Sequence, residues 1–594
     1  MDDQNKNLIL ATALSFLVIL VWFVLFPPAP VEEAAAPNEI VAADGTVLQV
    51  DADGTDAEIP ASSLLPPQSV DEVVGETARI EIDSPDLTGS LSLIGGRIDD
   101  LSLKGYNETL DEGSDLVRLL APIGTEAPYY ALHGWVPTVG PSADQVPGAA
   151  TEWQIESGDV LTPESDVTLV WDNNAGLIFR KTFSVDEDYL FTVQQSVENT
   201  TGAEIAMRPY GLVARHGEPY QIGFFIQHEG VVRMSDDSME EINYDDMPDL
   251  SPEEGRIEVA ENGWIGFSDQ YWMTALIPTP GSAFRSTARY ANDIYQIETI
   301  YPAITIPAGG IADADSQFFA GAQEWEVIRS YQNELGIERF LDSIDWGWFF
   351  FLTKPIFAVL HWLNGLIGNM GWSIIGLTLI IKALLLPLAY KSFVSMAKMR
   401  ELQPQMEKLK EAAGDDREKL QKGMMELYKT NKVNPASGCL PILMQIPIFF
   451  SLYKVIFVTI ELRHAPWIGW INDLSSPDPS SIFNLFGLLP WDAPAPESIL
   501  SLVFIGIMPI VLGISMWLQQ KLNPAPTEPT QKMIIAWMPW VFMFMLGSFA
   551  SGLVLYWIAN NTITFTQQYL IMRSQGIKPD VFGNIRGKKS TDTK

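Results

Sequence analysis

The chain has 594 residues, too many for one ordinary domain, and 47% of them are hydrophobic. The net charge of −37 is unevenly spread, because residues 27–345 hold 57 acidic and 14 basic side chains and everything else carries a net +6. An acidic region of this size repels phosphates, which excludes DNA as its partner. The single cysteine, Cys439, excludes an intrachain disulfide and a thiolate metal cluster.

The N-terminus predicts a membrane anchor. Residues 8–26 are almost wholly apolar, close to the roughly 20 residues that span a bilayer as a helix and longer than the roughly 7–15 of a signal-peptide core. We therefore interpret 1–26 as an uncleaved transmembrane anchor, with a cleaved signal peptide as the alternative. Residues 27–75 are rich in Pro, Ala, Asp and Glu and predict a disordered linker.

Residues 76–330 have the pattern of an all-β domain. Short alternating runs such as 78–82 (ARIEI) and 191–197 (FTVQQSV) are separated by Gly, Pro, Asn and Asp. Many short strands with turn residues between them predict a large β-sandwich, and this length can bury a sizeable core. His133, His216 and His228 lie here, but no H-E-x-x-H or G-x-S-x-G motif accompanies them. We expect these histidines to be structural and the chain not to be an enzyme.

Residues 345–575 form a series of apolar blocks. Residues 347–364 are aromatic and amphipathic and predict a helix lying in the membrane interface. Residues 390–432 predict a helical hairpin that turns at Gly414. Five spans are expected besides the anchor, at 366–388, 436–459, 499–519, 533–549 and 552–571.

The distribution of basic residues predicts the orientation. The hairpin holds ten Lys and Arg, and the tail at 576–594 is basic, whereas 460–497 holds one basic residue against five acids. By the positive-inside rule, the hairpin and both termini face the cytoplasm and the β domain faces outward. Six spans satisfy this arrangement.

Lys382 is the most informative residue, because it lies inside the second predicted span, roughly 9 Å before its cytoplasmic end. A charge in lipid costs about 2.5–3.5 kcal/mol and usually has a function, although a long lysine stem can also snorkel to the interface. Thr378 precedes it on the same helical face. Tyr556, Asn560 and Thr564 form a polar stripe at i, i+4 spacing in the last span.

Most of these polar residues fall in the cytoplasmic halves of their spans, as does Ser515, while the outer halves are nearly pure hydrocarbon. Polar groups in a membrane face protein or water. This pattern favours a wet cavity open to the cytoplasm and sealed outside, and the alternative is interhelical hydrogen bonding in a closed bundle. No phosphate-binding G-x-x-x-x-G-K-[ST] loop occurs anywhere.

Other features have plainer interpretations. Lys454 lies near the outer end of the third span, where snorkelling would explain it. The hairpin methionines could form a soft surface for apolar segments, or could be the hairpin's own core. Those singled out are Met396, Met399, Met406, Met424 and Met425.

Five stretches in order resemble the YidC/Oxa/Alb membrane insertases, and together they cover about 345–575. They are 396–404 (MAKMRELQP), 432–441 (KVNPASGCLP), 445–449 (QIPIF), 461–463 (ELR) and 551–556 (SGLVLY). The long outward domain looks like that of the Gram-negative YidC type. The resemblance implies a bacterial inner-membrane protein with a five-helix insertase core, an N-terminal anchor and a periplasmic β-super-sandwich similar to sugar mutarotases.

The resemblance also implies a mechanism. Members of this family insert and fold transmembrane segments, alone or with the Sec translocon and its accessory subunits, through a hydrophilic groove that holds one cation. The groove cation is usually Arg, and Lys382 stands in that place, so the charge is kept and the planar fork is lost. The groove residues expected here are Lys382, Thr378, Tyr556, Trp557, Asn560, Thr564, Ser515 and Gln445.

The expected partners are nascent inner-membrane proteins, membrane lipids, and a ribosome reached through the hairpin and the basic tail. No metal or other cofactor is expected. An ion or solute transporter is one alternative, against which no Asp or Glu lies in any span and no inverted repeat occurs. Ion flux in sealed vesicles would favour it. An envelope glycan-binding protein is the other, and sugar binding by the β domain would favour that.

Overall fold

The computed structural model describes residues 39–41, 46–49, 59–60, 67–219, 227–414, 416–431, 433, 440–494, 498, 500, 503–523 and 529–576. The predicted anchor at 1–26 and nearly all of the tail lie outside these residues. Residues 1–63 and 64–594 form two units. In the first, three short strands form a small sheet within the segment predicted as a linker: β1 (Glu39–Val41), β2 (Thr46–Gln49) and β3 (Ile59–Pro60). They include β-forming Ile and Val side chains, which the acidic composition obscured.

Two large sheets form the β domain. The 11-stranded sheet comprises β10 (Val160–Leu161), β4 (Arg79–Asp83), β5 (Leu87–Ser92), β6 (Arg97–Asn107), β8 (Tyr129–Val139), β14 (Ile205–His216), β21 (Ile294–Ile300), β20 (Phe284–Ala291) and β17 (Arg256–Val259) in spatial order, with β7 (Leu116–Leu120) on β6 and β22 (Ile304–Ile306) on β14. The 9-stranded sheet comprises β16 (Ser238–Asn243), β15 (Gly230–Ser235), β18 (Gly263–Ser268), β19 (Trp272–Pro278), β23 (Ile311–Ala322), β13 (Leu190–Asn199), β12 (Leu177–Val185), β11 (Val167–Asp172) and β9 (Gln154–Ser157).

The sandwich follows from the alternation in the sequence. In β4 the buried positions are Ile80 and Ile82, with more exposed residues between them, and β13 alternates in the same way. Since successive side chains point to opposite faces, such strands bury one face and must pack it against another layer. The two sheets meet through side chains such as Tyr129, whose hydroxyl lies 2.6 Å from that of Thr274 on the other sheet. The prediction of a large β-sandwich is confirmed.

Two histidines of the β domain are buried in this sandwich. Burial lowers the pKa of His133 to about 3, helped by the nearby Lys181 ammonium, and lowers that of His216 to about 4. The Nε2 atom of His216 lies 3.3 Å from the Tyr130 hydroxyl. The histidines that the sequence analysis weighed as possible catalytic groups are thus, in these two cases, neutral parts of the interior.

Acid is expected to destabilise the β domain through these histidines. Their pKa values are lower in the folded state than the ordinary 6.5, so the unfolded state binds more protons as the pH falls below that value. The stability is therefore complete above about pH 6.5 and declines towards pH 4, by up to about 1.4 kcal/mol per pH unit for each histidine. Thermal unfolding of the full chain, followed by circular dichroism between pH 7 and pH 4, measures the decline. His216→Gln should make it shallower, and an unchanged pH dependence in that variant would contradict the assignment.

The remaining described residues are mainly helical. Two helices flank the sheets, α2 (Val70–Glu76) and α3 (Trp325–Glu334). The others are α4 (Phe350–Ile367), α5 (Met370–Leu384), α6 (Leu386–Ala413), α7 (Arg417–Thr430), α8 (Leu440–Val458), α10 (Ile507–Leu522), α11 (Pro529–Met545) and α12 (Ser551–Ser574). Short 3₁₀ turns occur at Ala143–Gln145, Tyr244–Asp249, Phe340–Ser343, Ile460–Leu462, Ile482–Asn484 and Leu546–Ser548.

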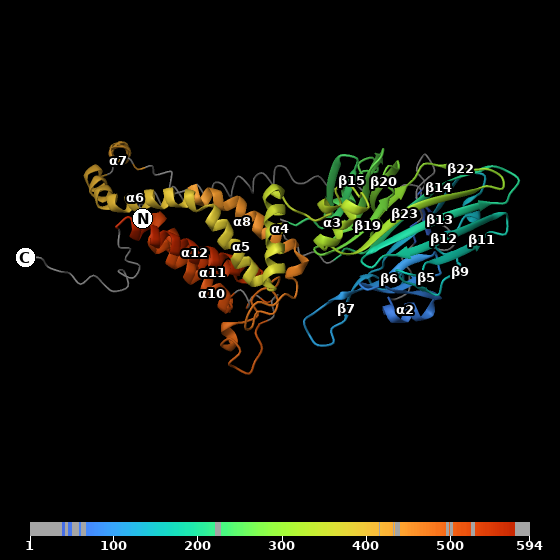
Figure 1. The fold of residues 1–594 in the computed structure, drawn as a ribbon, viewed down its shortest axis with the longest axis horizontal. Coiled ribbons are helices and arrows are strands. Elements are labelled where there is room, and N and C mark those ends of the chain that lie inside the picture. The colour runs from blue at the N-terminus through green and yellow to red at the C-terminus, as the bar shows by residue number, and fades with distance from the viewer. Residues whose placement is uncertain are drawn as a thin grey trace, which may run out of the picture. The chain divides into compact units, whose positions relative to one another are not determined.

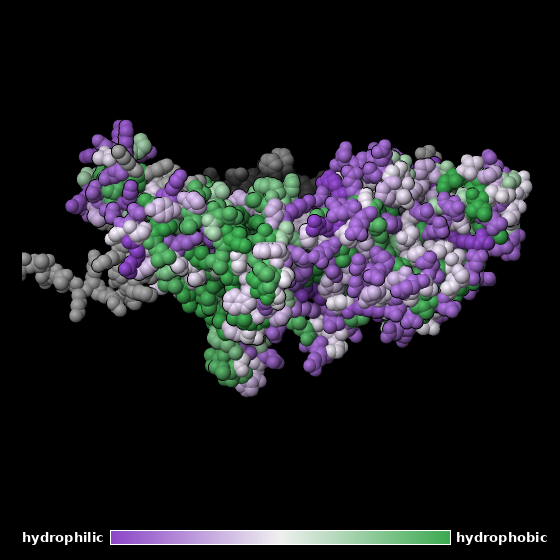
Figure 2. Space-filling view, in the orientation of Figure 1, coloured by the Kyte–Doolittle hydropathy of each residue, from purple (hydrophilic) through white to green (hydrophobic). Residues whose placement is uncertain are grey.

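The long helices form a bundle with α12 as a central member. Helix α12 packs against α5, α10, α6 and α8 (Figure 1). Its residues Leu553–Tyr556 are wholly buried, whereas many large apolar side chains of the surrounding helices are exposed. On the face in Figure 2, hydrophobic residues gather over these helices and hydrophilic residues over the strands. An apolar helical surface of this extent is typical of a domain in contact with lipid.

The second predicted span ends earlier than expected. The sequence predicted a span over 366–388 and a separate hairpin from residue 390, but α5 ends at Leu384 and α6 begins at Leu386, bent by 68°. Pro387 lies in the first turn of α6. Proline lacks an N–H and its ring clashes with the carbonyl four residues earlier, which accounts for the break. The hairpin's first helix therefore starts directly at the end of α5, and its turn follows Gly414 as predicted.

Helix α10, which overlaps the fourth predicted span at 499–519, begins at Ile507. Its first backbone N–H groups are satisfied by a preceding loop: Ile507 donates to the Ser480 hydroxyl at 2.9 Å, and Met508 donates to the Asp478 carboxylate at 2.7 Å. These side chains cap the helix, a tertiary contact that hydropathy does not encode.

Length and hydropathy single out α4 as the one helix of the described residues that could cross a membrane unaided. The bent pair of α5 with α6 meets the same criterion jointly, and Leu443–Val458 of α8 is apolar but shorter. The count of six spans is therefore not confirmed. Helix α4 is also the segment predicted to lie in the interface.

Candidate functional site

A chain of hydrogen bonds joins three helices around Lys382. The Lys382 ammonium of α5 donates to Oε1 of Gln445 on α8 at 3.1 Å, and Nε2 of Gln445 donates to the Tyr556 hydroxyl on α12 at 2.6 Å. A glutamine amide carries both an acceptor and donors, so it can bridge a cation and a hydroxyl. Gln567 of α12 also donates to the backbone carbonyl of Lys382 at 3.4 Å.

No carboxylate of the described residues forms an ion pair with Lys382, which is only partly buried. Helices α5 and α8 place this ammonium among mainly apolar side chains. A cation in such surroundings is normally paired. Among the described side chains, Gln445 is the hydrogen-bond partner of this ammonium, which keeps N–H donors beyond that bond.

A second polar cluster joins α12 to α10. Asn561 donates to the Ser515 hydroxyl at 3.1 Å, and Asn560 donates to Asn561 at 3.4 Å. Further along, Gln568 donates to Asn523 at 3.2 Å. The Oδ1 atom of Asn560 is buried and accepts no hydrogen bond within the described part of the chain. Tyr556 of the predicted stripe therefore contacts Gln445, the partner of Lys382, whereas Asn560 contacts Asn561, which bonds to α10.

The threonines and Ser515 use their hydroxyl protons within their own helices. Thr378 donates to the Ile374 carbonyl at 2.7 Å, Thr564 to Asn560 at 2.6 Å, and Ser515 to Leu512 at 2.7 Å. Thr378 is only 1% exposed. It lies one turn before Lys382, as predicted, but its side chain packs inside the bundle.

Trp557 contributes an apolar wall instead of a polar contact. Its ring stacks on Phe449 of α8, with centroids 4.7 Å apart and an interplanar angle of 7°, and meets Phe542 of α11 edge-on at 6.4 Å. The sequence analysis did not select these phenylalanines, because an aromatic residue in an apolar span carries no signal that distinguishes it from other lipid-facing or core residues. Trp557 thus lies where α8, α11 and α12 meet.

The hairpin methionines divide into two groups. Met396, Met399, Met406 and Met424 are half-buried, and the Tyr428 hydroxyl of α7 lies 3.9 Å from the Met406 sulfur of α6. Met425 is 68% exposed. Four of the five methionines therefore take part in packing of the hairpin helices. Of these five, Met425 is the one that is exposed.

Lys454 corrects an interpretation made from the sequence. It was expected to snorkel to the interface, but it is 3% exposed and forms an ion pair with Asp345, just beyond the 3₁₀ turn at Phe340–Ser343. Asp345 also accepts hydrogen bonds from the backbone N–H groups of His228 and Gly347. Sequence reasoning missed this pair because its partners are 109 positions apart. Among the described residues no group of three His, Cys, Asp or Glu could hold a metal.

A polar cluster around Lys382, set in an apolar helical bundle that follows a large β-sandwich, is typical of a membrane protein. Comparison with known proteins identifies the class. Residues 79–359 match the family model of the YidC periplasmic domain, and residues 362–578 match that of the 60Kd inner membrane protein.

Curated relatives match along the whole chain. The membrane protein insertase YidC of Dinoroseobacter shibae is 64% identical, with 98% of each chain covered, and that of Ruegeria pomeroyi is 62% identical, with 99% of this chain and 98% of the relative covered. A solved crystal structure of an active YidC insertase covers 94% of this chain and 99% of its own, with 17% identity and a TM-score of 0.34.

The chain belongs to the YidC family. By its family matches it is an inner-membrane protein with a periplasmic domain, as predicted. The names of its relatives describe insertases and not catalysts of a chemical reaction, which agrees with the expectation that the chain is not an enzyme.

Proposed function

We propose that this chain inserts and folds transmembrane segments of nascent inner-membrane proteins, with Lys382 as the group that attracts a client's polar tail. The observation that carries the proposal is the hydrogen-bonded chain from Lys382 through Gln445 to Tyr556, in which the cation has no acidic partner among the described residues. The insertase names of the full-length relatives support it.

The polar cluster would lower the free-energy cost of bringing a client's hydrophilic tail into the bilayer. A short hydrophilic tail must enter the bilayer before the apolar segment attached to it can leave the water. A cation with amide and hydroxyl neighbours replaces part of the lost hydration of that tail. The apolar segment then partitions into lipid and releases about 25 cal/mol per Å² of buried area, which drives the step without a nucleotide.

The full proposal includes the topology and the partners expected from the sequence. Six spans place both termini and the hairpin in the cytoplasm, and the groove comprises Lys382, Thr378, Gln445, Ser515, Tyr556, Trp557, Asn560 and Thr564. The Sec translocon, its accessory subunits and membrane lipids act with the chain, and the ribosome approaches the hairpin and the basic tail. The exposed Met425 supports a contact surface on the hairpin.

Photocrosslinking of a ribosome-stalled nascent membrane protein tests the groove. A photoreactive amino acid at position 382 or 557 should crosslink to the client, because both side chains are partly exposed. Position 378 should react less, since Thr378 is buried. Position 311, at the exposed Ile311 of β23, is the control and should give no product with a client that has not yet crossed. Equal labelling from 311 and 382 would reject the groove.

A further inference from the structure

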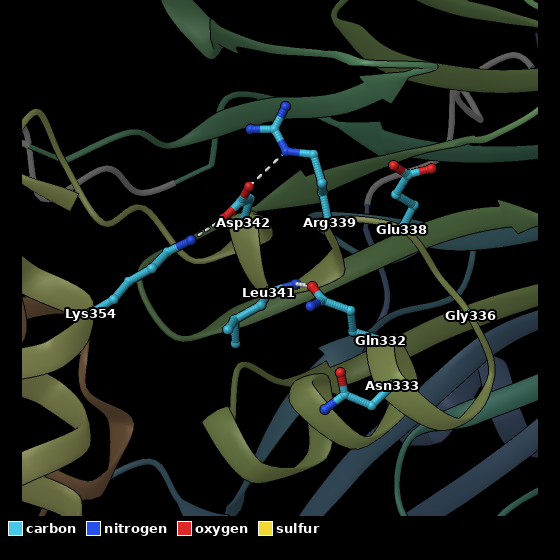
Figure 3. Close-up of a pocket in the computed structure, with 8 residues that line it drawn as sticks. All are labelled: Gln332, Asn333, Gly336, Glu338, Arg339, Leu341, Asp342 and Lys354. Carbon is cyan, nitrogen blue, oxygen red and sulfur yellow. Dashed lines mark hydrogen bonds and ion pairs between the residues drawn. The ribbon is translucent and has the colours of Figure 1, made fainter. Parts of the chain in front are cut away.

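Two adjoining pockets lie at the start of the helical part of the chain. The smaller has a volume of about 560 Å³, is lined by residues within 332–354 and is shown in Figure 3. The larger has a volume of about 1040 Å³ and is also lined by Phe450 and Lys454, so residues matched to the periplasmic domain meet residues matched to the inner-membrane domain there. Arg339, Asp342 and Lys354 line both pockets. Each pocket has about the size of sites that hold small organic ligands.

The smaller pocket is polar and carries charges of both signs. Asp342 lies between Lys354 of α4 and Arg339, and bonds to both, with its Oδ2 atom 2.8 Å from Arg339 Nε (Figure 3). Asp342 balances one of these two cations, and Glu338, which lines the same pocket, balances the other. Gln332, Asn333 and Glu338 complete the lining, so a second carboxylate lies on the same wall.

Arg339 is held in an unusual backbone conformation. Its φ of +53° lies in the left-handed region, which is uncommon for a residue other than glycine, asparagine or aspartate. Its side chain is 40% exposed, although its guanidinium contacts both Asp342 and the carbonyl of Asp237. The surrounding structure therefore fixes a cation at the mouth of the pocket at some conformational cost.

The larger pocket has an aromatic wall. Trp348, Phe350 and Phe450 line it and are respectively 93%, 56% and 40% exposed, and Trp346 and Phe349 lie beside them. Large aromatic residues at the end of membrane helices are typical of the level of the lipid headgroups. This pocket also contains Glu241, whose pKa is raised by burial and by the nearby Asp345 carboxylate. His228 and the Lys454 ammonium, which line the same pocket, offset part of this effect, and a further cation would stabilise the Glu241 carboxylate more.

We infer that these two pockets bind one phospholipid with a zwitterionic amino headgroup, drawn from the periplasmic leaflet. Its phosphate pairs with Arg339 and Lys354, its ammonium lies against Glu338 or Glu241, and its acyl chains rest on Trp348, Phe350 and Phe450. The mixture of charges selects a zwitterion, because an anionic headgroup without an ammonium would leave those carboxylates unmatched.

Native mass spectrometry of the full chain, purified into detergent and offered equimolar phosphatidylethanolamine and phosphatidylglycerol of identical acyl chains, tests the inference. The wild type should retain one phosphatidylethanolamine in clear preference to phosphatidylglycerol. Arg339→Ala with Lys354→Ala should reduce retention of both lipids by about tenfold or more, as expected for losing charge-assisted hydrogen bonds. Glu241→Gln with Glu338→Gln should remove the preference, by weakening retention of phosphatidylethanolamine and strengthening that of phosphatidylglycerol.

Matched variants separate binding from folding. Lys422→Ala removes an exposed lysine that pairs with Glu418 on the hairpin, and it should retain lipid like the wild type. Trp348→Ala leaves every ion pair in place and should still weaken retention of both lipids. Equal retention of the two lipids by the wild type, or unchanged retention in Arg339→Ala with Lys354→Ala, would overturn the inference. Neither outcome bears on insertion activity, so this test is independent of the proposed function.

Discussion

Lys382→Ala is expected to slow the insertion of a client with an acidic translocated tail by roughly tenfold to a hundredfold. Hydrogen bonds to a charged group contribute about 1.5–3 kcal/mol, which corresponds to that range of rates. Lys382→Arg should insert the same client at nearly the wild-type rate, because it keeps the charge and can still donate to Gln445. The wild-type ammonium already bonds to Gln445 at 3.1 Å and needs no planar geometry.

Insertion into proteoliposomes of two clients that differ only in tail charge provides the measurement. The acidic-tail client should be affected strongly and the neutral-tail client weakly, because the lost interaction is electrostatic. Lys521→Ala is the matched control, since this lysine belongs to α10 of the same bundle and rests on Trp517, with its ammonium 5.0 Å from the ring centroid. Equal insertion rates of the acidic-tail client for the wild type and Lys382→Ala would show that the Lys382 charge has no role in insertion.

Lys454→Met is expected to destabilise the folded chain strongly. It leaves the Asp345 carboxylate largely buried without its cation, and breaking a buried ion pair in this way costs about 3–5 kcal/mol. The methionine keeps the length of the side chain, so packing changes little. We expect a lower Tm for the full chain in detergent, with residues on both sides of the pair unfolding together.

The double variant Lys454→Met with Asp345→Asn distinguishes the charge from the packing. Asparagine keeps one of the two carboxylate oxygens and can accept a hydrogen bond from the N–H group of His228 or of Gly347 but not from both, so the double variant should recover part of the lost Tm. Lys422→Met on the exposed hairpin should leave the Tm unchanged. A Tm of Lys454→Met equal to that of the wild type would show that the ion pair between Lys454 and Asp345 does not stabilise the fold.

The sequence predicted those parts of the fold that local pattern determines. Alternation at Ile80 and Ile82 specifies a half-buried strand, and Gly414 specifies the end of α6. The break at Leu385 was not anticipated, although Pro387 was visible, because hydropathy continues across it and proline is tolerated within the first turn of a helix. The start of α10 at Ile507 could not be predicted, because its capping residues, Asp478 and Ser480, lie in a loop nearly 30 positions earlier.

The candidate site shows the same limit. Helical spacing placed Tyr556, Asn560 and Thr564 on one side of α12, but it could not determine which neighbouring helix each would face. Gln445 contacts Tyr556, whereas Asn560 donates to the neighbouring Asn561, which in turn donates to Ser515. The ion pair between Lys454 and Asp345 could not be predicted either. Asp345 lies before the apolar helices in the sequence, and nothing in the sequence indicates that it contacts α8.

The hydroxyl groups of Thr378, Thr564 and Ser515 can accept further hydrogen bonds but cannot donate them. Each hydroxyl has already committed its only proton to a carbonyl of its own helix, so it can offer a visiting chain nothing but lone pairs. All three residues are buried, so a client's peptide N–H groups could reach these lone pairs only where the helices separate. In the insertase role proposed above, the bundle would then select among polar segments by the direction of the hydrogen bond as well as by charge.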